Sequence, residues 1–308
     1  MKFALKTTPK NTHKTSMASK TNLQPSQIRL NKLLAERGVA SRRGSDKMIE
    51  EGQVSVNGKK VYELGIKVNP SVDKITVSGK PLRAKNQNLY IMFNKPKNVI
   101  TSMNDPLERV TVADYMKEVP GRVYPIGRLD WDSEGLILLT NDGDFAQKVM
   151  HPKEEVTKTY HVKLSGQPQP YQIKKLLTGV SIPEAGKVKA KLVEKLKAVK
   201  DKNKKTSEKN DWYKIIITEG KNHQVREMFK KIGFDVIKLQ RVAIGKLRIG
   251  TLERGAFVYL NDAAVERVFL QDLPTDNGIR EHRPKSTKKI APVTKKKFNK
   301  GLRLPDEE

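Results

Sequence analysis

Residues 127–143 read G-R-L-D-W-D-S-E-G-L-I-L-L-T-N-D-G, and this stretch does most to decide the fold. An arginine and three acids stand directly before an apolar run, 136–140, and an Asn-Asp-Gly turn follows that run. A short apolar run bounded by turn residues is typical of a buried strand. Because charge is costly beside a buried strand, we expect these charged residues to have a function, and we expect Asp130 to carry chemistry.

The acidic loop before this strand allows three other interpretations. Asp130, Asp132 and Glu134 follow the spacing of a calcium-binding loop, but the twelfth position is Asn141, where such a loop carries a bidentate Glu. Two nearby carboxylates could divide the acid and base roles of a glycoside hydrolase, although nothing else in the sequence indicates a sugar-binding cleft. A purely structural loop is the third interpretation.

The composition narrows the classes of partner. The 308 residues carry a formal net charge of +27, and a protein this basic usually meets a polyanion, nucleic acid first. No apolar stretch approaches the roughly 20 residues that a membrane-spanning helix needs. Cysteine is absent and the five histidines are scattered, which excludes disulfides and Cys-based zinc sites. We therefore expect a cytoplasmic protein with no metal site and no membrane contact.

Both ends of the chain are basic and poor in large apolar side chains. Residues 1–27 contain five lysines and no acid, and residues 271–308 mix lysine clusters with proline. Such segments cannot bury enough apolar surface to offset the entropy of ordering. We therefore expect a disordered basic arm at 1–27 and a disordered basic tail at 271–308. A lysine-rich stretch at 195–211 is expected to be an exposed loop between strands.

The first ordered unit, 28–82, is predicted to contain two helices, a hairpin and a further strand. Its apolar residues begin at helical spacing, and Gly38 suits the position just after a helix end. Ser41 can cap a second helix. Asn57-Gly58 between two valine-rich runs is a strong signal for a two-residue hairpin.

Six basic side chains fall on this helix pair: Arg29, Lys32, Arg37, Arg42, Arg43 and Lys47. One interpretation is an ordinary solvated face. The other is a small RNA-binding module, because cations fixed on a pair of helices can follow a phosphate backbone by its shape. The spacing of the residues leaves both interpretations open.

Residues 83–88 are polar and are predicted to link this unit to a larger domain at 89–270. Strand patterns occur at 89–93, 136–140, 158–164, 213–218 and 256–260, and helix patterns at 144–150, 170–178, 222–232 and 262–270. The two kinds of pattern do not alternate strictly. We therefore expect the α+β class, with a mixed, mainly antiparallel sheet flanked by helices.

Two further motifs lie in this larger domain. Residues 219–226 read E-G-K-N-H-Q-V-R, where a glycine turn opens a helix and exposes N–H groups that suit a phosphate. Lys221, His223 and Arg226 add positive donors for a substrate there, although an ordinary basic helix start has the same composition. Lys158 and Tyr160 share one face of a predicted strand. Tyr160 is then either a core residue or a platform for a nucleobase.

Taken together and in this order, the motifs resemble those of the ribosomal RNA pseudouridine synthases that carry an N-terminal S4 RNA-binding domain. The matching runs are G-R-L-D-x-x-S-E-G-L-x-L-L-T-N-D-G, H-P-K-E-E-V-T-K-T-Y and E-G-K-N-H-Q-V-R-E-M-F. The module at 28–75 is similar to the S4 domain itself. Within the family, the large-subunit type B is the most similar, with the small-subunit and F-type relatives as alternatives.

The resemblance implies roles for single residues. Asp130 matches the catalytic aspartate, and Tyr160 matches the tyrosine that packs against the target uracil. Arg226 matches the basic residue that pairs with the aspartate. Arg128 matches the arginine that organises the loop around a flipped-out nucleotide. Leu247 is the candidate for an apolar residue that lines the pocket.

The resemblance also implies a reaction, the isomerisation of one uridine to pseudouridine in ribosomal RNA, expected to be the 23S RNA. Isomerisation adds no group and involves no redox change, so we expect no cofactor, and we expect a monomer. The alternative from another class is a non-catalytic RNA-binding or ribosome-assembly factor, which the charge and the basic module alone favour equally. A synthase of the same family that acts on 16S ribosomal RNA is the remaining alternative.

Overall fold

The structure, a computed structural model, describes residues 27–196 and 211–273. The chain divides into two compact units, with the boundary between Arg83 and Ala84. The expected arm up to residue 26, the lysine-rich segment at 197–210 and the expected tail from residue 274 lie outside the described residues. Residues 271–273 are described, and Asp272 forms an ion pair with Arg248 at 2.7 Å.

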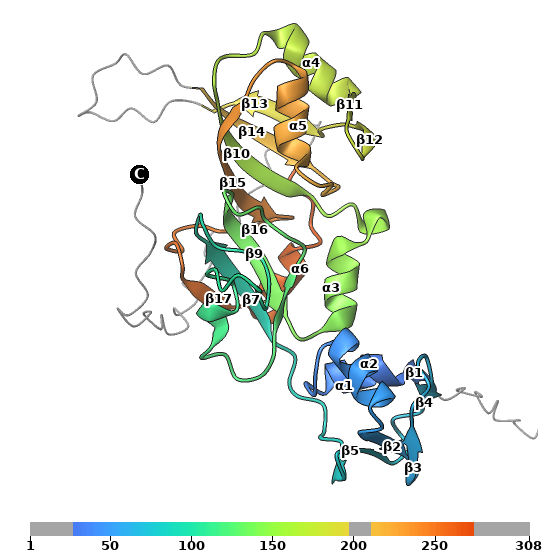
Figure 1. The fold of residues 1–308 in the computed structure, drawn as a ribbon. Coiled ribbons are helices and arrows are strands. Elements are labelled where there is room, and N and C mark those ends of the chain that lie inside the picture. The colour runs from blue at the N-terminus through green and yellow to red at the C-terminus, as the bar shows by residue number, and fades with distance from the viewer. Residues whose placement is uncertain (1–26, 197–210, 274–308) are drawn as a thin grey trace, which may run out of the picture. The chain divides into compact units, whose positions relative to one another are not determined.

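The first unit is built from two helices and two small sheets (Figure 1). The helices are α1 (Leu30–Glu36) and α2 (Arg42–Glu50). The strands are β1 (Ile28–Arg29), β2 (Val54–Val56), β3 (Lys59–Val61), β4 (Lys67–Val68), β5 (Ile75–Val77) and β6 (Lys80–Pro81). Strand β1 pairs with β4, and the larger sheet has the order β3-β2-β5-β6. The predicted order of helix, helix, hairpin and strand is confirmed, whereas β1 and β4 were not predicted.

Local signals in the sequence account for these elements. The Ser41 hydroxyl accepts a hydrogen bond from the Gly44 amide at 2.9 Å and so caps α2. Asn57 and Gly58 have φ values of 52° and 82°, as the tight turn between β2 and β3 requires. One apolar core holds the helices to the strands; its buried members are Leu30, Leu33, Leu34, Ile49, Val54, Val68 and Ile75.

The second unit is organised around one large sheet. Its strands run in the order β13-β14-β10-β15-β9-β7-β17, with β16 beside β15 and β8 beside β9. Their bounds are β7 (Tyr90–Lys95), β8 (Tyr124–Ile126), β9 (Glu134–Thr140), β10 (Lys158–Leu164), β13 (Leu192–Lys195), β14 (Trp212–Ile217), β15 (Val236–Ile244), β16 (Leu247–Arg248) and β17 (Phe257–Tyr259). Strands β11 (Val180–Ile182) and β12 (Gly186–Val188) form a separate hairpin. Only β15 and β9 pair in parallel among the described strands, so the predicted mixed, mainly antiparallel sheet is confirmed.

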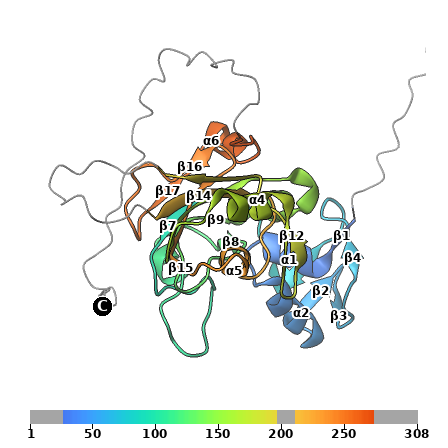
Figure 2. The same cartoon turned by 90° about the horizontal axis from the view of Figure 1, so that it is seen from above.

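Helices cover both faces of this sheet. Their bounds are α3 (Gly143–Met150), α4 (Pro170–Thr178), α5 (Gln224–Lys231) and α6 (Asp262–Arg267), with short 3-10 turns η1 (Asp114–Met116) and η2 (Pro152–Glu154). Residues of α4 and α5 belong to one apolar core, and residues of α3 and α6 pack into the other. Figure 2 shows α5 and α6 on opposite sides of the sheet. No helix of the described residues is long and apolar enough to cross a membrane.

The central strand β9 contributes to both cores. Ile137 and Leu139 lie in the core beneath α4 and α5, whereas Leu136 and Leu138 lie in the core beneath α3 and α6. A strand buried on both faces needs apolar residues at every position. This is the physical reason for the continuous apolar run that follows the acidic loop.

The parallel pairing of β15 with β9 brings a second strand against that loop. Arg241 of β15 pairs with Gly135 of β9. Gly135 has a φ of +110°, and a Cβ at this position would collide with the backbone of Arg241. Glycine therefore permits a close approach of the two backbones that another residue would prevent.

The predicted elements of the second unit all have counterparts in the structure, whereas β8, β11, β12, β13, β15 and β16 were not predicted, and β8 and β15 contribute residues to the site. Helix α4 and strand β10 have the predicted bounds, and β9 begins earlier than predicted, at Glu134. The longest described strand, β15, was not predicted, because its run V-I-K-L-Q-R-V-A-I neither alternates cleanly nor stays apolar.

Candidate active site

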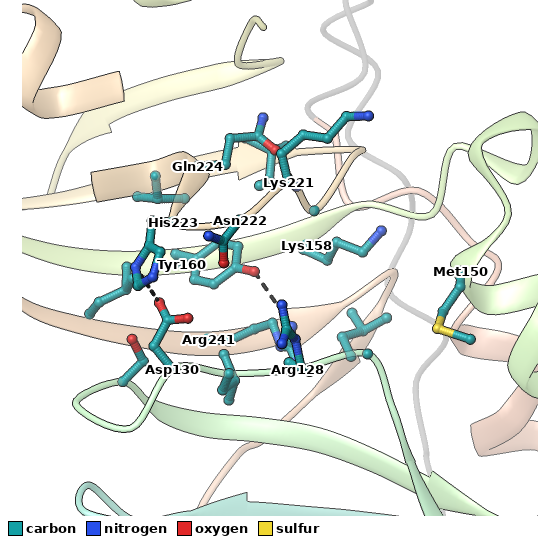
Figure 3. Close-up of a pocket in the computed structure, with 18 of the residues that line it drawn as sticks. Arg128, Asp130, Met150, Lys158, Tyr160, Lys221, Asn222, His223, Gln224 and Arg241 are labelled. Atoms are coloured by element: carbon teal, nitrogen blue, oxygen red, sulfur yellow. Dashed lines mark hydrogen bonds and ion pairs between the residues drawn. The ribbon is translucent and has the colours of Figure 1, made fainter. Parts of the chain in front are cut away.

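A cavity of about 290 Å³ opens where the loop before β9, strands β10 and β15, and the start of α5 meet (Figure 3). Four cationic residues line this cavity: Arg128, Lys158, Lys221 and Arg241. Asp130 is the one acidic residue among the lining residues of the described chain. A site with several cations and a single carboxylate suits an anionic ligand and makes Asp130 the one carboxylate that could act as a nucleophile there.

The loop that carries Asp130 is fixed by the last residue of β7 and by the chain that follows this strand. The buried Lys95 ammonium donates to the Ser133 carbonyl at 2.8 Å. The Asn98 amide donates to the Trp131 carbonyl, also at 2.8 Å. Burial lowers the pKa of Lys95 to about 8, and the negative charge of Asp130 opposes that shift. The backbone beside Asp130 is thus held at two points.

The Asp130 carboxylate faces a histidine. Its Oδ2 lies 3.5 Å from Nδ1 of His223, and both side chains are partly exposed. His223 precedes α5 and has a left-handed backbone, with φ at +47°. That conformation is uncommon outside glycine, although histidine is among the residues enriched there. The contact becomes an ion pair when the imidazole is protonated.

The expected pairing of Arg226 with Asp130 is wrong. Nη2 of Arg226 lies 2.6 Å from Oδ2 of Asp132, and Nη1 donates to the Val236 carbonyl at 3.0 Å. The reason is the position at which α5 begins, Gln224. His223, the residue directly before the helix, contacts Asp130, whereas Arg226, in the first turn of the helix, contacts Asp132. Arg226 therefore anchors the loop instead of touching the candidate nucleophile.

The third acid of the loop also has a structural partner. Oε2 of the buried Glu134 lies 3.0 Å from Nε of Arg254. The carboxylates of Asp130, Asp132 and Glu134 thus face three different side chains, His223, Arg226 and Arg254. No group of three His, Asp or Glu side chains that could hold a metal ion occurs within the described ranges. The calcium-loop interpretation finds no support in this geometry.

Tyr160 and Arg241 meet at the wall of the cavity. They are cross-strand partners on β10 and β15, and the Arg241 guanidinium lies 3.5 Å from the Tyr160 hydroxyl (Figure 3). Nε of Arg241 donates to the Leu136 carbonyl at 2.7 Å. Its Nη2 is buried without a hydrogen-bond partner among the described residues. Sequence reasoning missed Arg241, and the available signal was an arginine within an otherwise largely apolar strand.

Lys158 lies on the same face of β10 as Tyr160, and both residues line the cavity. Its ammonium donates to the Thr218 carbonyl at 2.9 Å and to the Val156 carbonyl at 3.1 Å. Burial lowers the pKa of Lys158 to about 8, and the nearby positive charge of Arg241 acts in the same direction.

The remaining predicted site residues have mixed outcomes. Arg128 and Lys221 line the cavity. The Lys221 amide is used within its own turn, where it donates to the Gln224 side chain at 2.9 Å. Leu247 does not line the cavity, so that prediction is wrong. It is buried in the core beneath α3 and α6, and its cross-strand neighbour Ile244 lines the cavity.

The six basic residues predicted for the first unit lie on or beside its helices. The exposed ones are Arg29, Arg42, Arg43 and Lys47. Lys32 is partly buried and contacts Glu36 at 3.5 Å, and Arg37 donates to the Arg83 carbonyl at 3.3 Å. Three of the four exposed cations therefore lie on α2, where Lys47 is 3.7 Å from Glu51.

Comparison with known proteins gives several close relatives. The chain is 44% identical over 240 residues to ribosomal large subunit pseudouridine synthase B of Bacillus subtilis, which covers 78% of this chain and 95% of that protein. It is 37% identical over 244 residues to an uncharacterised RNA pseudouridine synthase of Aquifex aeolicus, covering 79% and 94% of the two chains. A crystal structure of a pseudouridylate synthase matches with a TM-score of 0.54 and 28% identity, covering 78% of this chain and 99% of that one.

Models of two protein families match separate parts of the chain. The S4 domain matches residues 28–73, and RNA pseudouridylate synthase matches residues 89–231. The matches to a pseudouridine synthase model and to an S4 domain identify the chain as an RNA-modifying enzyme of the isomerase class. The chain belongs to the RNA pseudouridine synthase family.

Proposed function

We propose that the protein converts one uridine of 23S ribosomal RNA to pseudouridine, with Asp130 as the nucleophile. The observation that carries this proposal is the position of Asp130, the one acidic residue lining a cavity whose other charged residues are cationic. The choice of large-subunit RNA is supported by the relative that is named for that subunit. The protein acts as a cytoplasmic monomer.

The reaction rearranges bonds within one nucleotide. The N1–C1′ bond of uridine breaks, the uracil turns, and C5 bonds to C1′. The proton that C5 loses is balanced by the proton that N1 gains, so no co-reactant is needed. A carboxylate can serve in each of three routes: attack on C1′ of the ribose, attack on C6 of the base, or assistance to a glycal intermediate.

The residues around the cavity take separate roles in this proposal. The target uridine leaves the base stack, at a cost of a few kcal/mol, and its ring packs against Tyr160. The Tyr160 hydroxyl assists removal of the C5 proton. Arg128, Lys221 and His223 bind the nucleotide. Arg226 keeps the loop in position through Asp132, which lies 2.6 Å away.

The two units divide the work. Residues 28–82 bind the RNA through the cations on and beside α1 and α2, residues 83–88 form a linker, and residues 89–270 carry out the isomerisation. The RNA-binding cations are Arg29, Lys32, Arg37, Arg42, Arg43 and Lys47. Because such contacts read phosphate position and RNA shape, the first unit helps to select the region of RNA that reaches the cavity.

The test is to delete the gene and map pseudouridines in both large ribosomal RNAs, then to restore it as wild type or as Asp130→Asn. We expect one pseudouridine of 23S RNA to disappear and to return only with the wild-type gene. Asp130→Asn keeps the size of the side chain and removes its nucleophilic charge. Loss of a pseudouridine from 16S RNA would show that the substrate is 16S RNA and not 23S RNA. Unchanged modification after the deletion, or rescue by Asp130→Asn, would refute the enzymatic role of Asp130.

A further inference from the structure

Trp131 is an exposed aromatic residue directly beside the proposed nucleophile. Its exposed fraction is 53%, which is high for so large an apolar side chain. Residues 126–130 and Ser133 line the cavity, whereas Trp131 does not. The indole therefore lies outside the cavity, on the same loop that carries Asp130.

The backbone that carries this indole is rigidly held. The Trp131 carbonyl accepts a hydrogen bond from the Asn98 amide at 2.8 Å. The next residue, Asp132, is paired with Arg226 at 2.6 Å. The indole itself takes part in none of the hydrogen bonds or ring contacts between described residues. A fixed loop thus presents a flat apolar side chain to solvent.

An exposed indole beside an RNA-modifying cavity fits a nucleobase better than an apolar protein surface. The neighbouring cavity is lined by the cations Arg128, Lys158, Lys221 and Arg241, which favour a polyanion. When a target nucleotide leaves the stack, its neighbours lose a stacking partner. Aromatic side chains commonly supply that partner for unpaired RNA bases.

We propose that Trp131 is a stacking platform for an unpaired nucleobase that flanks the target uridine. This inference rests on the proposed function and adds a second base-binding site to it. Stacking needs only the face of a base, so the platform adds affinity and positions the strand while tolerating several base types. It acts in binding and not in bond formation.

Tryptophan fluorescence tests the contact directly, because the chain contains only Trp131 and Trp212. The Trp212→Phe protein retains Trp131 as its one tryptophan. The probe is a short RNA hairpin that carries the mapped uridine, with 5-fluorouridine at that position. We expect this RNA to quench the fluorescence of Trp212→Phe and to leave that of Trp131→Phe, which reports Trp212, largely unchanged. No quenching in Trp212→Phe at saturating RNA overturns the proposal.

Affinity provides the second measurement. We expect Trp131→Ala to weaken binding of the same RNA about tenfold and to raise KM at unchanged kcat, whereas Trp131→Phe stays near wild type. The matched control is Tyr171→Ala, because Tyr171 is 62% exposed and lies on α4. Equal affinity of Trp131→Ala and Tyr171→Ala would also overturn the proposal. Failure of the proposed function can be distinguished from failure of the stacking proposal, because in that case the wild-type protein forms no pseudouridine.

Discussion

Nη2 of Arg226 lies 2.6 Å from Oδ2 of Asp132, and Nδ1 of His223 lies 3.5 Å from Oδ2 of Asp130. Two residues at the start of α5 thus hold two alternate residues of the acidic loop. The loop is also tied to the end of β7 through Lys95. This double attachment fixes the proposed nucleophile without placing an arginine against it.

Loss of the Arg226 anchor should impair turnover more than folding. We expect Arg226→Ala to lower kcat by at least tenfold, because the loop then moves relative to the cavity. Asp132 is 53% exposed in its side chain, so the ion pair contributes only up to about 1 kcal/mol of stability. Turnover of an RNA fragment and the thermal midpoint Tm are the two measurements.

A double-mutant cycle identifies the partner of Arg226. Asp132→Asn should lower kcat in the same way, and the double variant should lose little more than either single one. Arg109→Ala is the control, because Arg109 forms an ion pair with Asp105 at 2.8 Å, has an exposed side chain and lies outside the cavity lining. A large fall in Tm with normal turnover in Arg226→Ala would contradict the anchoring role.

Lys158 should make the stability of the second unit depend on pH. Burial lowers its pKa from 10.5 to about 8. Below about pH 8 Lys158 is protonated in both the folded and the unfolded protein, and the folded protein bears the full cost of the buried charge. Between about 8 and 10.5 the unfolded chain keeps a proton that the folded protein has released, so stability rises with pH.

The variant Lys158→Met tests this linkage. We expect it to be more stable than wild type at pH 7 by about 1–3 kcal/mol, and we expect the difference to narrow above pH 8. Urea unfolding at several pH values measures the free energy of unfolding of each protein. Lys95 is present in both proteins, so its own pH dependence cancels from the difference. Lys163→Met, on the same strand but outside the cavity, serves as the control. A difference that stays constant from pH 7 to 10 would contradict the prediction.

Gly135 should tolerate no side chain. With φ at +110° and the Arg241 backbone against it, Gly135→Ala combines backbone strain with a collision. We expect a loss of at least about 2 kcal/mol in the free energy of unfolding, together with reduced activity. Gly233→Ala is the matched control, because Gly233 has a φ of +90° and open space around it. Equal losses in the two variants would show that the contact with β15 is unimportant.

The sequence predicted those features that depend on neighbouring residues. The apolar run of β9 and the Asn57-Gly58 turn are local patterns, and both formed as expected. Arg241 escaped prediction because its place in the site comes from the pairing of β15 with β9 and β10, which no local spacing reveals. Leu247 was misplaced for the same reason, since the neighbouring strand position, Ile244, faces the cavity instead.

The ion-pair partner of Arg226 could also not be predicted from the sequence. Which acid it meets depends on the residue at which α5 begins and on the left-handed backbone of His223. A shift of one residue in that start would turn the arginine to another part of the loop. Motif spacing identified the residues that gather at the cavity, and tertiary packing decided which of them touch.

The cations of α2 should contribute to RNA affinity through phosphate contacts. Arg42, Arg43 and Lys47 are exposed, with 76% of the Lys47 side chain accessible. Replacing all three by glutamine should weaken RNA binding and reduce the slope of log affinity against log salt by about 0.7 to 0.9 per lost phosphate contact. Titrations of one RNA hairpin at several salt concentrations measure the slope.

The matched control replaces Lys59, Lys60 and Lys80, which are exposed on β3 and β6 of the same unit, by glutamine. Equal effects of the two triple variants would show diffuse attraction by net charge and would contradict an RNA-binding face on α2.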